Sequence, residues 1–268
     1  MLLFKQDSKV FNFIQPLGIL ILVTFFNLLF VGLFDSTIYA TAVSDILIVV
    51  FLYLFFGKSK LKFFQNSITN VFDKIPIFIY FIIIFALVYF ASQSAGLFII
   101  ENVSDINFDE YSNALQGNSI NETGVSLFLV LVLAPVSEEL LYRGIFFTSW
   151  YKIHPIFGFV GSALVFAIVH GTLAHTVSAF LFGLFLALIY SLTGSILISI
   201  SSHILYNTLV LFLSDAVFSK FFSVLSFNDT VISLLILYVF TLICLFKGFS
   251  YMLYKRNQNV KLLGFGIS

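Results

Sequence analysis

The chain has 268 residues, of which 60% are hydrophobic and only 10% are charged, with 13 basic and 13 acidic side chains. So little charge cannot cover a soluble domain of this length, which excludes an ordinary water-soluble fold. The balanced charge and the lack of a basic, aromatic-interleaved patch give no indication of a nucleic-acid partner.

Apolar runs of about 20 residues recur along the chain, each long enough to cross a bilayer core. They predict an all-α, polytopic membrane bundle of about eight helices in a single domain, residues 1–268, with N-terminal spans over 11–100. The spans are expected at 11–34, 38–57, 76–100, 125–149, 156–174, 176–192, 194–213 and 230–250.

The segments between the spans predict an orientation in the membrane. Residues 60–74 read as an amphipathic piece along the inner surface, whereas the loop 101–124 carries acids and no base. In this arrangement 11 of the 13 basic residues fall on one side, which places both termini in the cytoplasm. These 11 are Lys5, Lys9, Lys58, Lys60, Lys62, Lys74, Lys152, Lys247, Lys255, Arg256 and Lys261.

The fourth span contains three charges in the stretch "APVSEELLYRG". Each ionisable group near the bilayer centre costs roughly 2.5–3.5 kcal/mol, so these groups should face the bundle interior. Glu139 and Arg143 are four residues apart and can form an ion pair on one helix face. Glu138 points about 100° away, which leaves it freer to act as a base. The alternative for Glu139 and Arg143 is a salt bridge that only ties helices together.

Two later spans carry further polar residues. In the fifth span Phe166 and His170 share a face, and in the seventh Ser199, His203 and Asn207 recur every fourth residue. A lone histidine is often a satisfied core residue, and interhelical hydrogen bonding would explain Ser199. It explains a histidine and an asparagine one turn apart less well, which favours a function for His203 and Asn207.

This set of side chains supports hydrolysis. A desolvated carboxylate suits the role of general base, and histidine and asparagine can donate hydrogen bonds to an oxyanion. No serine stands in a Gly-x-Ser-x-Gly setting and the single cysteine, Cys244, has no histidine nearby in sequence, so water is the expected nucleophile. Glu138, His170 and His203 could also ligate Zn²⁺, although the His-Glu-x-x-His motif is absent.

Three ordered blocks resemble the motifs of the CAAX prenyl protease and bacteriocin-processing (CPBP, or Abi) family of intramembrane proteases. The resemblance covers about residues 125–213 and includes the Thr-Gly-Ser before the last histidine. The blocks are Glu138-Glu139-x-x-x-Arg143, Phe166-x-x-x-His170 and His203-x-x-x-Asn207.

The resemblance implies roles for these residues. Glu138 and His170 would activate the water, while His203 and Asn207 would stabilise the oxyanion. The family is usually called a metalloprotease family, yet a metal-free, glutamate-type mechanism has also been argued for it. The supporting residues would be Glu139, Arg143 and Phe166.

The resemblance also implies an active site inside the bundle and a membrane-associated peptide or protein as substrate. The Phe-, Ile-, Asn- and Lys-rich composition favours a bacterial cell-membrane peptidase, with a role in bacteriocin immunity or peptide maturation, over a processor of CAAX proteins. Two alternatives are a proton- or cation-coupled transporter and a non-catalytic membrane adaptor whose charges only lock the bundle.

Overall fold

The structure is a computed structural model, and it describes residues 8–33, 42–50, 75–102, 124–222 and 227–262. These residues form helices and no strand. Four helices are long and apolar enough to cross a membrane, and two further apolar helices are shorter. The four are Lys9–Phe30, Ile79–Ile99, Leu173–Thr193 and Val231–Tyr254. The predicted all-α membrane bundle is therefore confirmed.

The N-terminal part supplies α1 (Lys9–Leu33), a helical segment at 42–50 and α3 (Ile75–Asn102). Of the predicted second span, 38–57, only this segment lies in the described part of the chain. The predicted amphipathic piece 60–74 and nearly all of the loop 101–124 lie outside the described residues. Many apolar side chains of α1 are exposed, Ile21 at 70% and Phe25 at 59%, as expected of a helix that faces lipid.

One continuous helical run, residues 124–153, corresponds to the predicted fourth span. α-Helical and π-helical stretches alternate within it. In the π-helical stretches the backbone hydrogen bonds join residues five apart instead of four. The run ends because His154, which precedes Pro155, adopts an extended backbone with φ −158°. The stretches are α5 (Gly124–Phe128), η1 (Leu129–Leu133), α6 (Ala134–Glu139), η2 (Leu140–Phe147) and α7 (Thr148–Ile153).

The second half of the chain forms η3 (Phe157–Gly161), α8 (Ser162–Ile168), α9 (Leu173–Thr193), α10 (Ile196–Phe222) and α11 (Phe227–Leu262). The predicted fifth span, 156–174, was too long, because the helix ends at Ile168. Gly171 then takes a φ of 81°, and the Thr172 hydroxyl caps the next helix by accepting from the His175 amide. Both α10 and α11 run beyond their predicted ends at 213 and 250.

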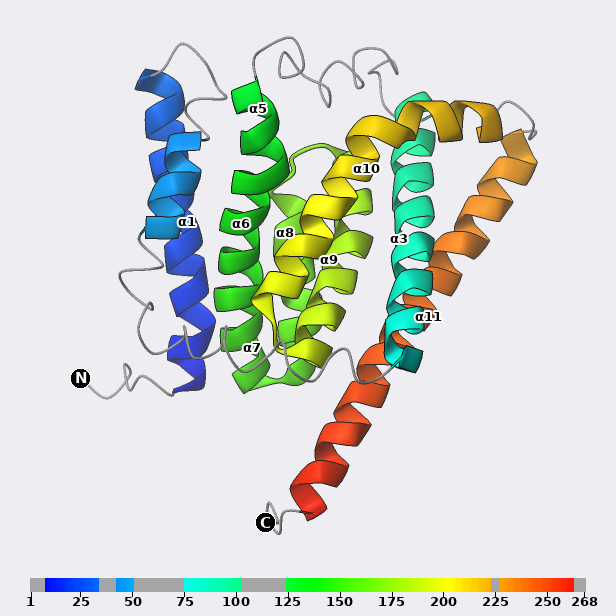
Figure 1. Cartoon of the computed structure of the whole chain (residues 1–268). Coiled ribbons are helices and arrows are strands. Elements are labelled where there is room, and N and C mark those ends of the chain that lie inside the picture. Colours follow the sequence, from blue (N-terminus) through cyan, green and yellow to red (C-terminus); the bar gives the residue numbers. More distant parts are fainter. Residues whose placement is uncertain (1–7, 34–41, 51–74, 103–123, 223–226, 263–268) are drawn as a thin grey trace.

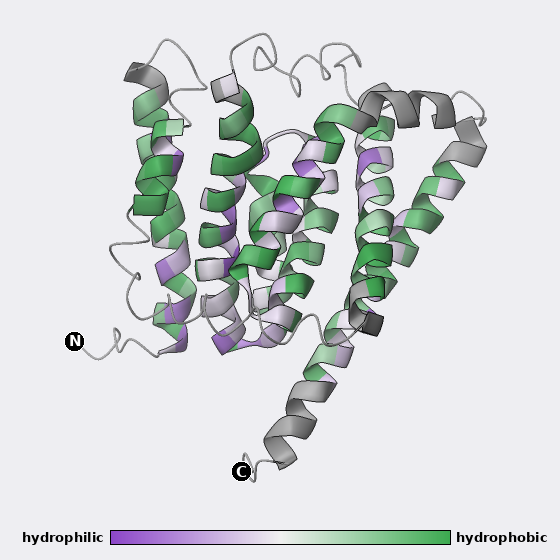
Figure 2. Cartoon of the chain, in the orientation of Figure 1, coloured by the Kyte–Doolittle hydropathy of each residue, from purple (hydrophilic) through white to green (hydrophobic). Residues whose placement is uncertain are grey.

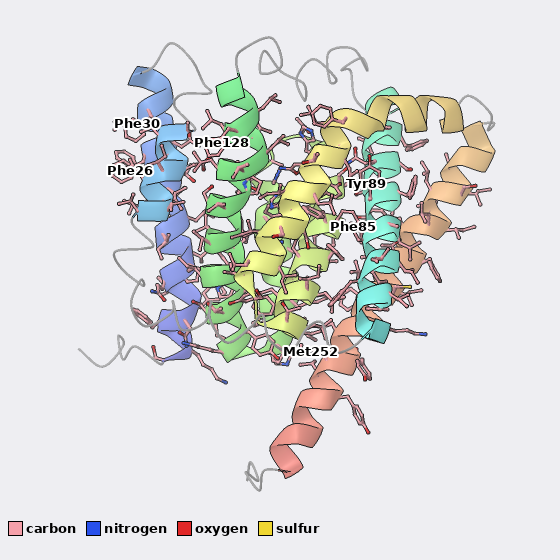
Figure 3. All side chains as sticks on the ribbon, viewed as in Figure 1. Phe26, Phe30, Phe85, Tyr89, Phe128 and Met252 are labelled. Carbon is pink, nitrogen blue, oxygen red and sulfur yellow. The ribbon has the colours of Figure 1, made fainter. Side chains whose placement is uncertain are left out.

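The helix α9 forms the centre of the bundle, and α3, α8, α10 and α11 pack against it (Figure 1). Every residue from 181 to 190 is buried. From α3, Phe85 lies with its ring edge-to-face against Phe185 of α9 and Tyr206 of α10 (Figure 3). Gly194, with a φ of 66°, ends α9 and lets the chain turn back into α10.

Hydrophilic positions interrupt the otherwise apolar ribbons of α6 and α10 in the middle of the bundle (Figure 2). The two helices pack against each other, and η2 packs against α8, α9 and α10. This packing brings the fourth, fifth and seventh predicted spans together around one buried polar cluster.

The contact between η3 and α7 gives a test of the packing. A β-carbon on buried Gly158 would lie 2.7–2.9 Å from the backbone and Cβ of Tyr151, whereas one on Gly18 of α1 would meet nothing within 4 Å. We expect Gly158→Ala to lower the free energy of unfolding by about 1–3 kcal/mol through overpacking. Gly18→Ala, the matched control, should be neutral or slightly stabilising. The fluorescence of Trp150, the single tryptophan, reports unfolding in detergent; equal effects of both variants would contradict the packing described.

Candidate active site

The carboxylate of Glu139 is the centre of the polar cluster, and its side chain is fully buried at 0% exposure. It accepts hydrogen bonds from Arg143 Nη1 at 2.9 Å and from Ser199 Oγ at 2.6 Å. The imidazole Nδ1 of His203 lies 3.0 Å from the same carboxylate. The ion pair predicted from the spacing of Glu139 and Arg143 is thus present, and it also binds α10.

Arg143, also 0% exposed, reaches two further helices. Its Nη2 donates to the carbonyl oxygen of Gly183 in α9 at 3.0 Å, and its guanidinium carbon lies 4.7 Å from the ring centroid of Phe166 in α8. Position 183 is tightly packed, because a β-carbon there would lie 3.1–3.2 Å from Ala163 and Phe166 and these neighbours would have to shift. The charge is therefore neutralised by Glu139 and held by a carbonyl and an aromatic face.

His203 is held in one orientation from three sides. Its ring lies edge-to-face against Phe166 and Phe182, with centroid distances of 5.8 and 5.1 Å. Because the Glu139 carboxylate is an acceptor, Nδ1 of His203 carries the proton that they share. The Nε2 atom then points toward Glu138, whose Oε2 is 3.7 Å away.

Glu138 and Glu139 differ in the way that the helical spacing predicts. The Glu138 side chain is 31% exposed, and 3.7 Å is too long for a direct hydrogen bond to His203. Glu139, by contrast, makes three close contacts at full burial. Glu138 therefore keeps acceptor capacity for a further group placed between it and His203.

His170 lies in the turn after α8. Its Nδ1 is 2.7 Å from the Phe166 carbonyl oxygen, so Nδ1 donates and Nε2 is left as the acceptor. The Phe166 ring contacts both imidazoles, with centroids 4.7 Å from His170 and 5.8 Å from His203. Phe166 and His170 thus share a face as predicted, and Phe166 links His170 to the polar cluster.

Asn207 follows His203 by one turn of α10. Its Nδ2 donates to the Val130 carbonyl of η1 at 3.4 Å, a long hydrogen bond. In a π-helix, each carbonyl oxygen accepts a hydrogen bond from the N–H group five residues later. For Val130 that residue is Pro135, which has no N–H. The asparagine side chain therefore supplies a donor that the backbone lacks.

The donor set for Zn²⁺ is not assembled in this arrangement. Among the described residues, no group of three or more His, Cys, Asp or Glu side chains lies close enough to hold a metal ion. Glu138 and His203 approach each other, whereas the described contacts of His170 are with Phe166. These residues do not fit a metal site as they stand, and zinc ligation by Glu138, His170 and His203 stays a prediction.

Two contacts of the cluster had no prediction from the sequence. Ser137 Oγ donates to Asp45 Oδ1 in the segment 42–50 at 2.7 Å, and Phe182 of α9 packs on His203. The signal for Asp45 was an ionisable residue inside a predicted span, which is costly unless it has a partner. Phe182 carries no such signal, because one phenylalanine among 37 is indistinguishable from lipid-facing residues.

Comparison with known proteins identifies the segment that carries this cluster. Residues 121–209 match the family described as type II CAAX prenyl endopeptidase, Rce1-like. The match covers this segment and not the rest of the chain. All seven motif residues, from Glu138 to Asn207, lie inside it, and the resemblance to the CPBP proteases is confirmed.

A curated relative matches part of the same region. A protein of Bacillus subtilis (strain 168) named "Putative membrane peptidase YdiL" is 32% identical over 80 residues, which are 30% of this chain and 33% of that protein. The match therefore spans about one third of the relative's length. No solved structure matches the chain significantly.

The buried ion pair gives a second prediction. Arg143→Met leaves the Glu139 carboxylate uncompensated in an apolar interior, which should lower the free energy of unfolding by about 3–5 kcal/mol. Adding Glu139→Gln to this variant should recover part of the loss, because the uncompensated charge is then gone. Lys152→Met removes an exposed base at the end of α7 and should change stability by no more than about 0.5 kcal/mol. The fluorescence of Trp150 measures all three, and equal stabilities of the Arg143 and Lys152 variants would contradict the assignment.

Proposed function

We propose that the protein is an intramembrane endopeptidase that hydrolyses a peptide bond with a water activated by Glu138. The observation that carries the proposal is the pair formed by Glu138 Oε2 and His203 Nε2, 3.7 Å apart within the bundle. His203 is fixed by Glu139, while Glu138 is free of close hydrogen bonds from the described side chains. An unsaturated acceptor beside an oriented imidazole is what a bound, activated water requires.

The reaction begins when the Glu138 carboxylate takes a proton from the water as oxygen attacks the carbonyl carbon of the substrate. His170, through its acceptor Nε2, helps to hold the water. The proton then passes from Glu138 to the leaving amine as the C–N bond breaks. Attack by water, without a covalent enzyme intermediate, fits a cluster that holds acids and imidazoles but no cysteine.

His203 and Asn207 stabilise the oxyanion in this proposal. The Nδ1–H group of His203 donates a hydrogen bond to Glu139. The ring can therefore also donate a hydrogen bond from Nε2 only as the imidazolium ion. The hydrogen bond to Glu139 holds the ring in place for that role, so the buried ion pair also supports the proposed site. Asn207 adds an amide donor on the same helix face, one turn away.

The proposed substrate is a membrane-associated peptide or protein of a bacterial cell membrane. The matching relative is bacterial, and its name gives it as a membrane peptidase. We favour bacteriocin immunity or peptide maturation as the setting, with cleavage of prenylated CAAX proteins as the alternative. Both termini are proposed to be cytoplasmic, since α1 begins and α11 ends at the same end of the bundle (Figure 1).

The central prediction concerns the base. Glu138→Gln keeps the shape of the side chain and removes the proton acceptor, so cleavage should fall at least about 100-fold. His203→Gln should have a comparable effect, and His154→Gln, an exposed histidine outside the cluster, serves as the matched control. The assay follows cleavage of internally quenched peptides, prenylated at a CAAX box or unmodified, by protein in lipid vesicles.

The same variants separate the rival functions. If Glu138→Gln cleaves at the wild-type rate, the endopeptidase proposal is wrong. Proton or cation flux in the same vesicles that depends on Glu138, without any peptide cleavage, would instead indicate a transporter. Folded variants without any change in either assay would leave the adaptor, whose charges only lock the bundle.

Metal removal gives a further prediction. Because no three His, Cys, Asp or Glu side chains of the described residues lie close enough to hold a metal ion, we propose a metal-independent mechanism and route no step through zinc. Cleavage should survive treatment with a chelator that strips zinc, with elemental analysis of the same sample as the check. Activity that is lost with the metal and restored by Zn²⁺ alone would establish the zinc alternative.

A further inference from the structure

We infer that Asp45, from the N-terminal part of the chain, is a positioning residue for the catalytic turn. It lies in the helical segment 42–50, outside residues 121–209 that match the family. The inference rests on the proposed function and adds to it a residue from another helix. Asp45 is an ionisable side chain within an apolar, predicted membrane span. Burying such a group costs free energy, so we expect it to have a partner or a function.

The contact that carries the inference joins Asp45 to the residue just before Glu138. Ser137 is 1% exposed, and its hydroxyl lies 2.7 Å from Asp45 Oδ1 and 2.9 Å from the Ala134 carbonyl oxygen. A hydroxyl has one hydrogen to donate, and a carboxylate is the stronger acceptor. The hydrogen bond to Asp45 therefore sets the Ser137 side chain in one orientation.

The two residues of α6 that flank Glu138 are bound in different directions. Ser137 is held by the segment 42–50, Glu139 is held by α10 through Ser199 and His203, and Glu138 lies between them. Successive side chains on a helix differ by about 100°, so fixing the two neighbours fixes the rotation of the turn that carries Glu138. Asp45 fixes this turn on the side of Ser137, where the contacts of Glu139 do not act.

The irregular backbone around α6 gives the hydrogen bond between Asp45 and Ser137 its importance. Pro135 gives no amide hydrogen to the turn before Ser137, and π-helical stretches flank α6 on both sides. Such a turn has fewer regular backbone hydrogen bonds to define its rotation. The Glu138–His203 separation of 3.7 Å is therefore sensitive to whether Asp45 holds Ser137.

Asp45 also lies near enough to Glu138 for their charges to interact. The other charged or titratable groups that act on Glu138 are His203 from α10, and Glu139 and Arg143 from its own helical run. This proximity supports the placement of Asp45 at the site, although the positioning role rests on the hydrogen bond.

The test compares four variants and one control on the best-cleaved peptide of the quenched panel. Asp45→Ala and Ser137→Ala each remove the bond, and kcat should fall about 10- to 100-fold from a small misplacement of Glu138. The value of KM should stay within about twofold, because the bond contributes nothing to peptide binding. Asp45→Asn keeps an acceptor oxygen for Ser137 and should retain kcat within about threefold. Ile46→Ala, on the same segment and 49% exposed, should leave kcat unchanged.

The double variant decides whether the two residues act as one. Asp45→Ala combined with Ser137→Ala should lose no more kcat than either single variant, because both remove the same bond. Additive losses, or wild-type kcat in Asp45→Ala, would overturn the inference. If Asp45→Ala does not fold, Ser137→Ala and the rescue by Asp45→Asn still decide it: loss of activity in Asp45→Asn equal to that in Ser137→Ala would count against positioning.

A contact measurement without catalysis completes the test. In a Cys244→Ala background, which removes the natural cysteine, cysteines at positions 45 and 137 should be joined by a short bifunctional thiol reagent. Absence of the cross-link would contradict the contact. Failure of the proposed function would appear as cleavage independent of Glu138, whereas failure of this inference would appear as cleavage that depends on Glu138 but not on Asp45.

Discussion

The buried pair of Glu139 and Arg143 is the interaction on which the site depends. Two charges at zero exposure are tolerable because each neutralises the other and because groups on neighbouring helices add further hydrogen bonds. The paired side chains also contact the surrounding helices. Arg143 donates to the Gly183 carbonyl of α9 and lies over the Phe166 ring of α8. Glu139 accepts a hydrogen bond from Ser199 of α10. The pair thereby fixes the positions of three helices around one point in the bundle.

Glu138 derives its character from the residues on either side of it. If it shared the partners of Glu139, its carboxylate would be saturated and unable to bind water. The 100° turn between neighbours prevents this, and the Glu138 side chain stays 31% exposed. A saturated carboxylate and a partly exposed one can therefore stand next to each other in sequence.

Much of this arrangement could be predicted from the spacing of residues on single helices. The ion pair of Glu139 with Arg143 and the shared face of Phe166 with His170 both follow from an interval of four residues. What the sequence could not predict are contacts set by packing between distant helices, such as Gly183 with Arg143. The end of the fifth span was also placed six residues too late, because hydropathy does not register the conformation of Gly171 or the Thr172 cap.

A salt bridge that ties helices together can also support a neighbouring site, so the two interpretations of Glu139 and Arg143 need not exclude each other. Glu139 accepts from Ser199 at 2.6 Å, which is a plain interhelical hydrogen bond. The same carboxylate accepts a hydrogen bond from Nδ1 of His203, and this orients the ring so that Nε2 faces Glu138. Any change that loosens the helix contact therefore also frees the imidazole. In this bundle, the bonds that hold the helices together are also the bonds that orient the buried polar groups.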